Sequence, residues 1–249
     1  MLRQEYLRRL VDNAHIELYL SANDGARIYW PWRMQPPSEA SRRYRDACEK
    51  YIIDSDPWND GIEATEILNC AFKLDAEIAS LQDVYLDKDG TVDKLLEGLE
   101  IADSHSFDGQ LLLPLQKPYV ECWKELGEPT EHMLGIGGLK DGSPEKRIRV
   151  SKQLRNAVGN DVWIHGFGWG IKGIAKSVQK NPKLIDSIDY STPMQNGANY
   201  DCSSGKERMS VAAMGGATKL VRDLREVGGF VETTAKYHRS DEQSALETF

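Results

Sequence analysis

Acidic, amide and imidazole side chains follow several short apolar segments, and these residue types could perform displacement chemistry at a sugar. The candidates are Asp54, Asp83, Gln116, His165 and Asp189. Two carboxylates suit reaction at an anomeric carbon, because one attacks to form a covalent glycosyl-enzyme while the other moves protons. A glutamine offers a donor and an acceptor to a purine edge. Each residue taken alone is more readily explained as a turn former at a strand end, since aspartate is common in turns, but their joint placement is less easily dismissed.

Glycines and a tryptophan occur close to these groups in the sequence. Gly137, Gly138 and Gly166 occur where apolar segments end, and a glycine lets the backbone approach a flat ligand closely. Trp58 comes four residues after Asp54 and could stack on a base, although a packed aromatic residue is an equal interpretation. Together these residue types suit a pocket for a planar heterocycle.

The charge distribution separates the chain into an acidic and a basic part. Positions 54–131 contain 19 acidic and 5 basic residues, whereas positions 140–183 contain 10 basic and 3 acidic residues. The net charge of −8 argues against broad, non-specific nucleic-acid binding, but a basic face remains compatible with it. One predicted helix could bind phosphates or simply form a solvated outer face through Lys146, Arg149, Lys152 and Arg155.

Short apolar segments alternate with helical patterns about every 25 residues, which indicates βαβ units and a parallel sheet. Strands are expected at 51–54, 77–83, 110–116, 133–138, 162–168 and 187–189, with two more from 15–21 and 27–32. Helices are expected at 61–74, from a cap at Thr91, at 118–126, after a Ser143-Pro144-Glu145 start, around 171–178, and in the tail at 206–227.

A closed barrel and an open doubly wound sheet both fit this alternation. The 249 residues match the roughly 250 that one α/β barrel uses, so we predict a single-domain parallel (β/α)8 TIM-type barrel over residues 1–249, complete or reduced. In such a barrel the C-terminal strand ends share one rim. The candidate side chains should therefore gather there.

The cysteines and the apolar segments restrict the class of protein. Cys48, Cys70, Cys122 and Cys202 have no C-x-x-C spacing, so free thiols are expected, without a disulfide framework or a zinc site. No segment approaches the roughly 18 apolar residues of a membrane span, and the N-terminus lacks a secretory apolar region. A cytoplasmic protein without a membrane partner is expected.

The chemistry-bearing segments also resemble the signature blocks of tRNA-guanine transglycosylases and of their DNA-acting relatives, the DpdA proteins. The blocks occur in the family's order over about residues 48–197: Tyr51-Ile52-Ile53-Asp54-Ser55, Leu115-Gln116, Gly135-Ile136-Gly137-Gly138-Leu139, Trp163-Ile164-His165-Gly166-Phe167-Gly168, and Asp189 four residues before Pro193.

This resemblance implies an eightfold βα barrel that exchanges a base through a covalent aspartyl intermediate. It implies Asp189 as the nucleophile and Asp54 as the general acid/base. It further implies a base pocket formed by Asp83, Gln116, Gly137, Gly138, Leu139, Trp58, His165 and Gly166. No cofactor is implied.

Departures from the family pattern bear on the substrate. Asp56-Pro57 replaces two glycines, the C-x-C-x-x-C zinc motif is absent from the sequence, and Met194-Gln195-Asn196 replaces arginines that the tRNA enzymes carry. These differences favour DNA over tRNA as the nucleic acid whose guanine is replaced by a 7-deazaguanine base. A homodimer or a partner in a modification complex is a further expectation.

Two alternatives remain open from the sequence. One is a barrel nucleosidase or glycosidase that uses the same carboxylates. The other is a non-catalytic, nucleic-acid-binding barrel in a base-modification complex.

Overall fold

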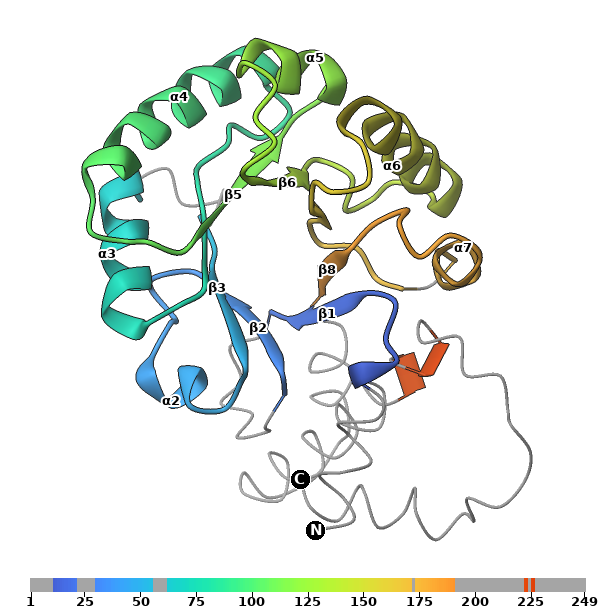
Figure 1. The fold of residues 1–249 in the computed structure, drawn as a ribbon, viewed down its shortest axis with the longest axis horizontal. Coiled ribbons are helices and arrows are strands. Elements are labelled where there is room, and N and C mark those ends of the chain that lie inside the picture. Colours follow the sequence, from blue (N-terminus) through green and yellow to red (C-terminus); the bar gives the residue numbers. More distant parts are fainter. Residues whose placement is uncertain are drawn as a thin grey trace, which may run out of the picture.

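Eight parallel strands form a closed barrel in which each strand pairs with its neighbours in chain order and β8 pairs with β1 (Figure 1). The computed structural model describes residues 11–21, 30–55, 62–171 and 173–190, together with 222, 223, 225 and 226. The predicted (β/α)8 TIM-type barrel is therefore confirmed, and its strand set is complete. The alternative of an open sheet is wrong, because the β1–β8 pairing closes the cylinder.

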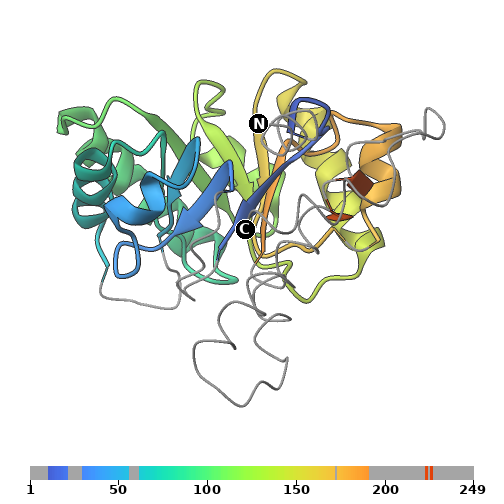
Figure 2. The ribbon, with the colours of Figure 1, turned by 90° about the horizontal axis from the view of Figure 1, so that it is seen from below.

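The strands are short, and all of them run in the same direction inside a layer of helices (Figure 2). They are β1 (Glu17–Leu20), β2 (Trp32–Gln35), β3 (Lys50–Ile53), β4 (Ile78–Ser80), β5 (Gln110–Leu115), β6 (Met133–Ile136), β7 (Ile164–Gly166) and β8 (Ser187–Tyr190). The helices are α2 (Arg42–Arg45), α3 (Ala64–Leu74), α4 (Lys88–Ser104), α5 (Tyr119–Glu125), α6 (Pro144–Val158) and α7 (Ala175–Lys180).

Alternation along each strand decides which side chains fill the barrel. Register partners in parallel strands share a face, so Tyr19 and Asp189, and likewise His165 and Ser187, point to the same side. The ring contact between Tyr19 and His165 identifies that side as the interior. The apolar residues between them, such as Ile188, face the helices. The interior is consequently rich in polar groups near the C-terminal rim.

The helices pack as their apolar periodicity predicts, with exceptions at three positions. Helix α6 is capped by the Ser143 hydroxyl, and its buried stripe contains Val150, Leu154 and Val158 as expected. Thr91 does not cap α4: Asp87 does, and the Thr91 side chain lies buried in the first turn. Phe72 and Leu96, which were expected to face inward, are exposed.

Two expectations for the chain ends change. The second strand begins at Trp32 and runs to Gln35, so the expected strand at 27–32 was placed too early. The predicted tail helix at 206–227 falls almost entirely outside the described residues.

The acidic and basic parts of the sequence occupy different arcs of the helical layer. Helices α3, α4 and α5 lie within the acidic stretch, whereas α6 and α7 lie within the basic stretch (Figure 1). Among the described residues, no helix has the length and apolar character needed to span a bilayer. Cys48, Cys70 and Cys122 are free thiols, and Cys202 lies outside the described residues.

Candidate active site

The C-terminal rim of the barrel carries two hydrogen-bonded groups of side chains, on opposite sides of the strand order. One belongs to β7, β8 and β1, and the other to the ends of β4, β5 and β6. Both groups are named after the roles that the sequence predicts for Asp189 and Asp83. The nucleophile cluster contains Ser21, His165, Gly168, Ser187 and Asp189. The recognition cluster contains Asp83, Leu86, Gln116, Gly137 and Gly138.

The Asp189 carboxylate is contacted by polar groups from three different segments. The backbone N–H of Gly168 donates to Oδ1 over 2.6 Å, and Nε2 of His165 lies 3.3 Å from the same oxygen. The Ser21 hydroxyl donates to Oδ2 over 3.1 Å. The Asp189 side chain is 13% exposed, so it is fixed in orientation yet reaches the barrel mouth. A carboxylate held in this way can present one oxygen to a ligand.

His165 supports Asp189 from below instead of flanking a base pocket. Its side chain is 0% exposed, and its ring packs edge-to-face against Tyr19 and Phe167 with centroid distances of 5.9 and 4.8 Å. Nδ1 lies 2.8 Å from the Ser187 hydroxyl. The expected contact of His165 with a base is therefore wrong, because the interior packing encloses the ring on every side.

Asp83, which is partly buried, and the buried Gln116 form a pair at the opposite side of the mouth. The Gln116 amide nitrogen donates to Asp83 Oδ2, and its oxygen accepts the Leu86 backbone N–H over 3.3 Å. Gln116 is fully buried. Its amide therefore orients the Asp83 carboxylate, and a direct contact between Gln116 and a base stays a prediction.

Burial raises the pKa of Asp83 above its usual value, and the hydrogen bond from Gln116 opposes that rise. The charged Asp83 carboxylate has therefore lost much of its hydration, and hydrogen-bond donors on a ligand would stabilise it.

The glycines of the recognition cluster are required by close packing. A Cβ on Gly137 would lie 2.4 Å from the Gln116 amide nitrogen, and one on Gly138 would lie 2.7 Å from its oxygen. Gly138 also has a φ of 65°, which side-chain-bearing residues rarely adopt. The turn after β6 thus lies directly on the Gln116 amide. The Tyr119 hydroxyl fixes the same turn by donating to the Gly137 carbonyl over 2.9 Å.

Asp54 lies at the end of β3 on the same rim. Its backbone N–H continues the ladder to Gln35, and alternation places its side chain on the interior face with Ile52. The side chain is half-buried. The three predicted carboxylates thus share one end of the barrel. Trp58 lies outside the described residues.

Two further residues assigned to base binding have packing roles in the structure. Trp169 and Ile185 occupy the space that a side chain on Gly166 would need. Leu139 is buried in the core, and its carbonyl accepts a hydrogen bond from Arg147. Only their backbone atoms could take part in base binding.

The basic residues of α6 divide into two groups. Lys146, Arg149 and Lys152 are exposed on the outer face, as phosphate binding would require. Arg155 is buried and donates to the Val162 carbonyl and to Asp186, at 2.6 and 2.5 Å. The expected phosphate contact of Arg155 is wrong, because the guanidinium is committed to the N-terminal ends of β7 and β8.

Sequence reasoning missed Ser21, Ser187, Trp163 and Leu86. Ser187 precedes Asp189 by two residues, so the period of a strand already places both on one face. Ser21 follows β1 as Asp54 follows β3, but the sequence did not define the first strand well enough to single out the residue at its end. No sequence signal distinguishes Leu86, because its contact with Gln116 arises from the turn after β4.

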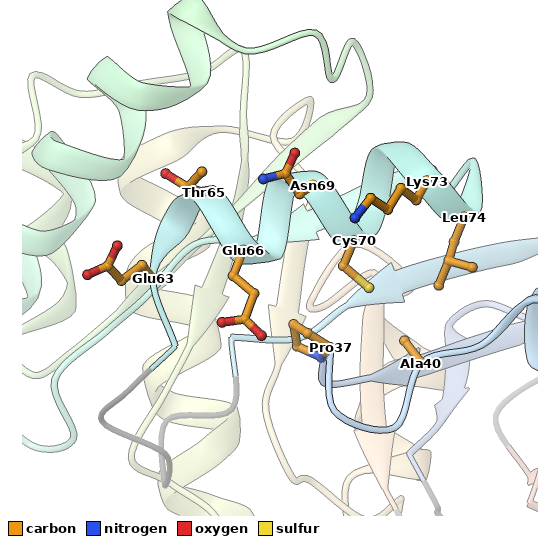
Figure 3. A pocket seen from close by; sticks show the side chains of 9 residues that line it. All are labelled: Pro37, Ala40, Glu63, Thr65, Glu66, Asn69, Cys70, Lys73 and Leu74. Carbon is orange, nitrogen blue, oxygen red and sulfur yellow. The ribbon is translucent and has the colours of Figure 1, made fainter.

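A pocket of about 630 Å³ lies on the outer flank of α3 (Figure 3). Pro37 and Ala40 face this flank, which is left uncovered because α2 has only 4 residues. The pocket is lined by Pro37, Ala40, Glu63, Thr65, Glu66, Asn69, Cys70, Lys73 and Leu74. None of the predicted site residues lines it. Within the described part of the chain, no three His, Cys, Asp or Glu side chains are grouped to hold a metal ion.

Comparisons with known proteins establish the fold and no family. No family model matches the chain, and no curated protein matches it in sequence. Among solved structures, the YdjI aldolase from Escherichia coli K12 resembles it with a TM-score of 0.59 and 12% identity, over 93% of this chain and 98% of that chain.

Two further structures resemble it to a similar degree. The fructose-bisphosphate aldolase from Campylobacter jejuni has a TM-score of 0.56 and 8% identity, over 91% of this chain and 94% of its own. A putative fructose-1,6-biphosphate aldolase from Coccidioides immitis has a TM-score of 0.53 and 11% identity, over 90% and 96%. At such low identity the likeness shows a shared barrel fold, so function has to be argued from the rim residues.

Proposed function

We propose that this barrel is a base-exchange glycosyltransferase that replaces guanine in a nucleic acid with a 7-deazaguanine base through a covalent aspartyl intermediate. The observation that carries the proposal is the Asp189 carboxylate, which donors from three segments hold at the mouth of the barrel. A partly buried carboxylate–amide pair lies beside a glycine turn on the same rim. In this proposal, β8 provides the nucleophile, and the ends of β4, β5 and β6 on the same rim provide the groups that recognise the base.

The first half-reaction uses Asp189 as the nucleophile. The target nucleotide must leave its stack, because a group inside the barrel mouth does not reach C1′ within a duplex. A lone pair of an Asp189 oxygen then bonds to C1′ while the C1′–N9 bond breaks and its electron pair stays on guanine. Asp54, as the carboxylic acid, gives its proton to the departing base.

The second half-reaction restores both carboxylates. The incoming 7-deazaguanine gives its N9 proton to the Asp54 carboxylate, and N9 attacks C1′. The ester bond to Asp189 breaks, and its electron pair returns to the carboxylate. Over one cycle the proton released to guanine is replaced by the proton from the incoming base.

The hydrogen bonds around Asp189 favour Oδ2 as the attacking atom. Among the described residues, Oδ1 is approached by both Gly168 and His165, at 2.6 and 3.3 Å, whereas Oδ2 receives a single bond, from Ser21 at 3.1 Å. Oδ1 would become the carbonyl oxygen of the ester and would keep its two donors. The carboxylate therefore needs no reorientation during the displacement.

The recognition cluster offers groups that complement guanine. Asp83 can accept from the N1–H and exocyclic amino group of the base, and the Gly138 turn brings backbone close to the ligand. The partly desolvated Asp83 gains from these donors. The same edge is present in a 7-substituted 7-deazaguanine, so one pocket serves both bases.

The exposed residues Lys146, Arg149 and Lys152 of α6 are the candidates for phosphate contacts. A homodimer or a modification-complex partner remains part of this proposal. We expect the protein to act in the cytoplasm.

An exchange assay tests the function directly. The purified chain is incubated with labelled guanine and, in parallel, with duplex DNA, single-stranded DNA and tRNA, and the label in each polymer is counted. Label in DNA supports the proposal as written, and label in tRNA alone changes its substrate. Release of free base without incorporation identifies a nucleosidase. Binding of nucleic acid without exchange or release would identify the non-catalytic barrel.

A further inference from the structure

A chain of hydrogen bonds runs through the barrel interior and ends at Asp189. The Trp163 indole N–H donates to the Ser187 hydroxyl over 2.8 Å, and that hydroxyl lies 2.8 Å from His165 Nδ1. His165 Nε2 then faces Asp189 Oδ1 at 3.3 Å. Ser187 and His165 are both 0% exposed, so water does not compete for these groups.

For a neutral His165 ring, the donors and acceptors of this hydrogen-bond chain permit one consistent direction. The indole nitrogen is a donor only, so the Ser187 oxygen accepts from Trp163. The Ser187 proton is then available to His165 Nδ1, which must be the unprotonated nitrogen of the ring. The remaining ring proton lies on Nε2 and points at the carboxylate.

The opposite tautomer conflicts with the same contacts. A proton on Nδ1 would leave the Nε2 lone pair against Asp189 Oδ1, which places two acceptors in contact. It would also leave the Ser187 proton without the His165 acceptor. Buried polar groups are rarely left in that state.

We propose that Ser187 and Trp163 are positioning residues that hold His165 as its Nε2–H tautomer, so that His165 fixes Asp189 Oδ1 and leaves Oδ2 for the substrate. The tautomer follows from the contacts alone, and its consequence for catalysis rests on the proposed function. The Trp163 end of this hydrogen-bond chain is also fixed in place, because the Lys50 ammonium lies 5.1 Å above the Trp163 ring and pairs with Glu17.

Nitrogen-15 NMR of the five histidines in the full-length, labelled protein tests the tautomer without any activity assay. The His165 signals, assigned by their loss in His165→Gln, should show a protonated Nε2 and an unprotonated Nδ1. In Ser187→Ala this fixed pattern should give way to a mixture of tautomers or to the imidazolium. Ser187→Thr keeps the hydroxyl and should restore the parent pattern.

Two further variants protect the result against general loss of structure. Trp163→Phe keeps a ring beside Lys50 but removes the N–H, and it should loosen the His165 pattern less than Ser187→Ala. Ser80→Ala removes another buried hydroxyl, which donates to the Leu81 carbonyl over 3.4 Å, and it should leave His165 unchanged. A parent His165 protonated at Nδ1, or an unchanged pattern in Ser187→Ala, would overturn the proposal.

The kinetic consequence is separable from the proposed function. If the parent exchanges bases, Ser187→Ala should lower kcat roughly 10- to 100-fold with KM for the base nearly unchanged, because only nucleophile placement is disturbed. Ser187→Thr should recover most of that loss. An inactive parent with the expected His165 pattern would refute base exchange and leave the tautomer assignment standing. An exchange rate unaltered by Ser187→Ala would refute the positioning role.

Discussion

The nucleophile cluster and the recognition cluster each contain a carboxylate at the barrel rim, but the two carboxylates have different surroundings. Asp189 accepts from a backbone N–H, an imidazole and a hydroxyl. Asp83 is held by one amide, and burial raises its pKa. Under the proposed function, these different surroundings would make one aspartate a fixed nucleophile and the other an acceptor for donors on the base.

The largest expected effect comes from removing the nucleophile. Asp189→Asn keeps the shape and the acceptor for Gly168 but removes the attacking anion, so base exchange should fall at least about a thousandfold. Any covalent adduct with nucleic acid on denaturing gels should also disappear. Base binding should persist, because the recognition cluster is untouched. Exchange near the parent rate would refute the covalent mechanism.

Asp186 provides the contrast at the other end of the same strand. It pairs with the buried Arg155 at 2.5 Å and accepts the Ile164 N–H at 2.8 Å, so its role is structural. Asp186→Asn leaves the Arg155 charge uncompensated and should lower the free energy of unfolding by about 3 kcal/mol. Urea denaturation measures that loss. Exchange per folded molecule should stay near the parent value, and a loss of exchange as large as that of Asp189→Asn would remove the distinction between the two ends of the strand.

The contrast between Asp186 and Asp189 also shows how much of the site the sequence predicts. The ends of the strands could be predicted because apolar segments stop at Asp54, Gln116 and Asp189, and a parallel barrel brings such ends to one rim. The assignment of Asp189 over Asp186 to the rim followed from that rule. The roles of His165 and Arg155 were mistaken, because burial depends on neighbours from other strands. The spacing of residues along the sequence does not indicate which residues of other strands will pack against them.

The recognition cluster should respond to loss of its charge with a weaker affinity for base. A carboxylate can accept hydrogen bonds on two oxygens, whereas the amide of Asp83→Asn can accept on only one. The free energy of guanine binding should therefore weaken by about 2 kcal/mol, a roughly thirtyfold loss of affinity. Equilibrium dialysis with labelled guanine measures this. Asp93→Asn, on the exposed face of α4, is the matched control and should change nothing. Equal affinities for parent and Asp83→Asn would move base recognition away from Asp83.

The same substitution should alter the pH dependence of stability. The pKa of Asp83 is raised in the folded chain, so the folded state binds more protons between the ordinary value of 3.8 and the raised value. The contribution of Asp83 to stability is therefore greatest below 3.8 and declines as pH rises through the raised pKa. Asp83→Asn lacks this decline, so its stability relative to the parent should be higher at pH 7 than at pH 4. A difference independent of pH in urea denaturation would contradict the burial of the charge.

The smallest effect concerns Leu86, which joins the recognition cluster through its backbone. Leu86 has a φ of 61° and is 63% exposed, yet its N–H donates to the Gln116 oxygen. A left-handed conformation is strained for leucine, so Leu86→Gly should raise the free energy of unfolding by up to about 1 kcal/mol. Glu128→Gly, at another exposed residue with a φ of 58°, should give a similar gain away from the rim. If the strain at Leu86 serves recognition, only Leu86→Gly should also weaken guanine binding, because a more flexible turn no longer holds the Gln116 amide against Asp83. Unchanged guanine affinity in Leu86→Gly would make Leu86 an ordinary turn residue and confine recognition to Asp83, Gln116 and the glycine turn.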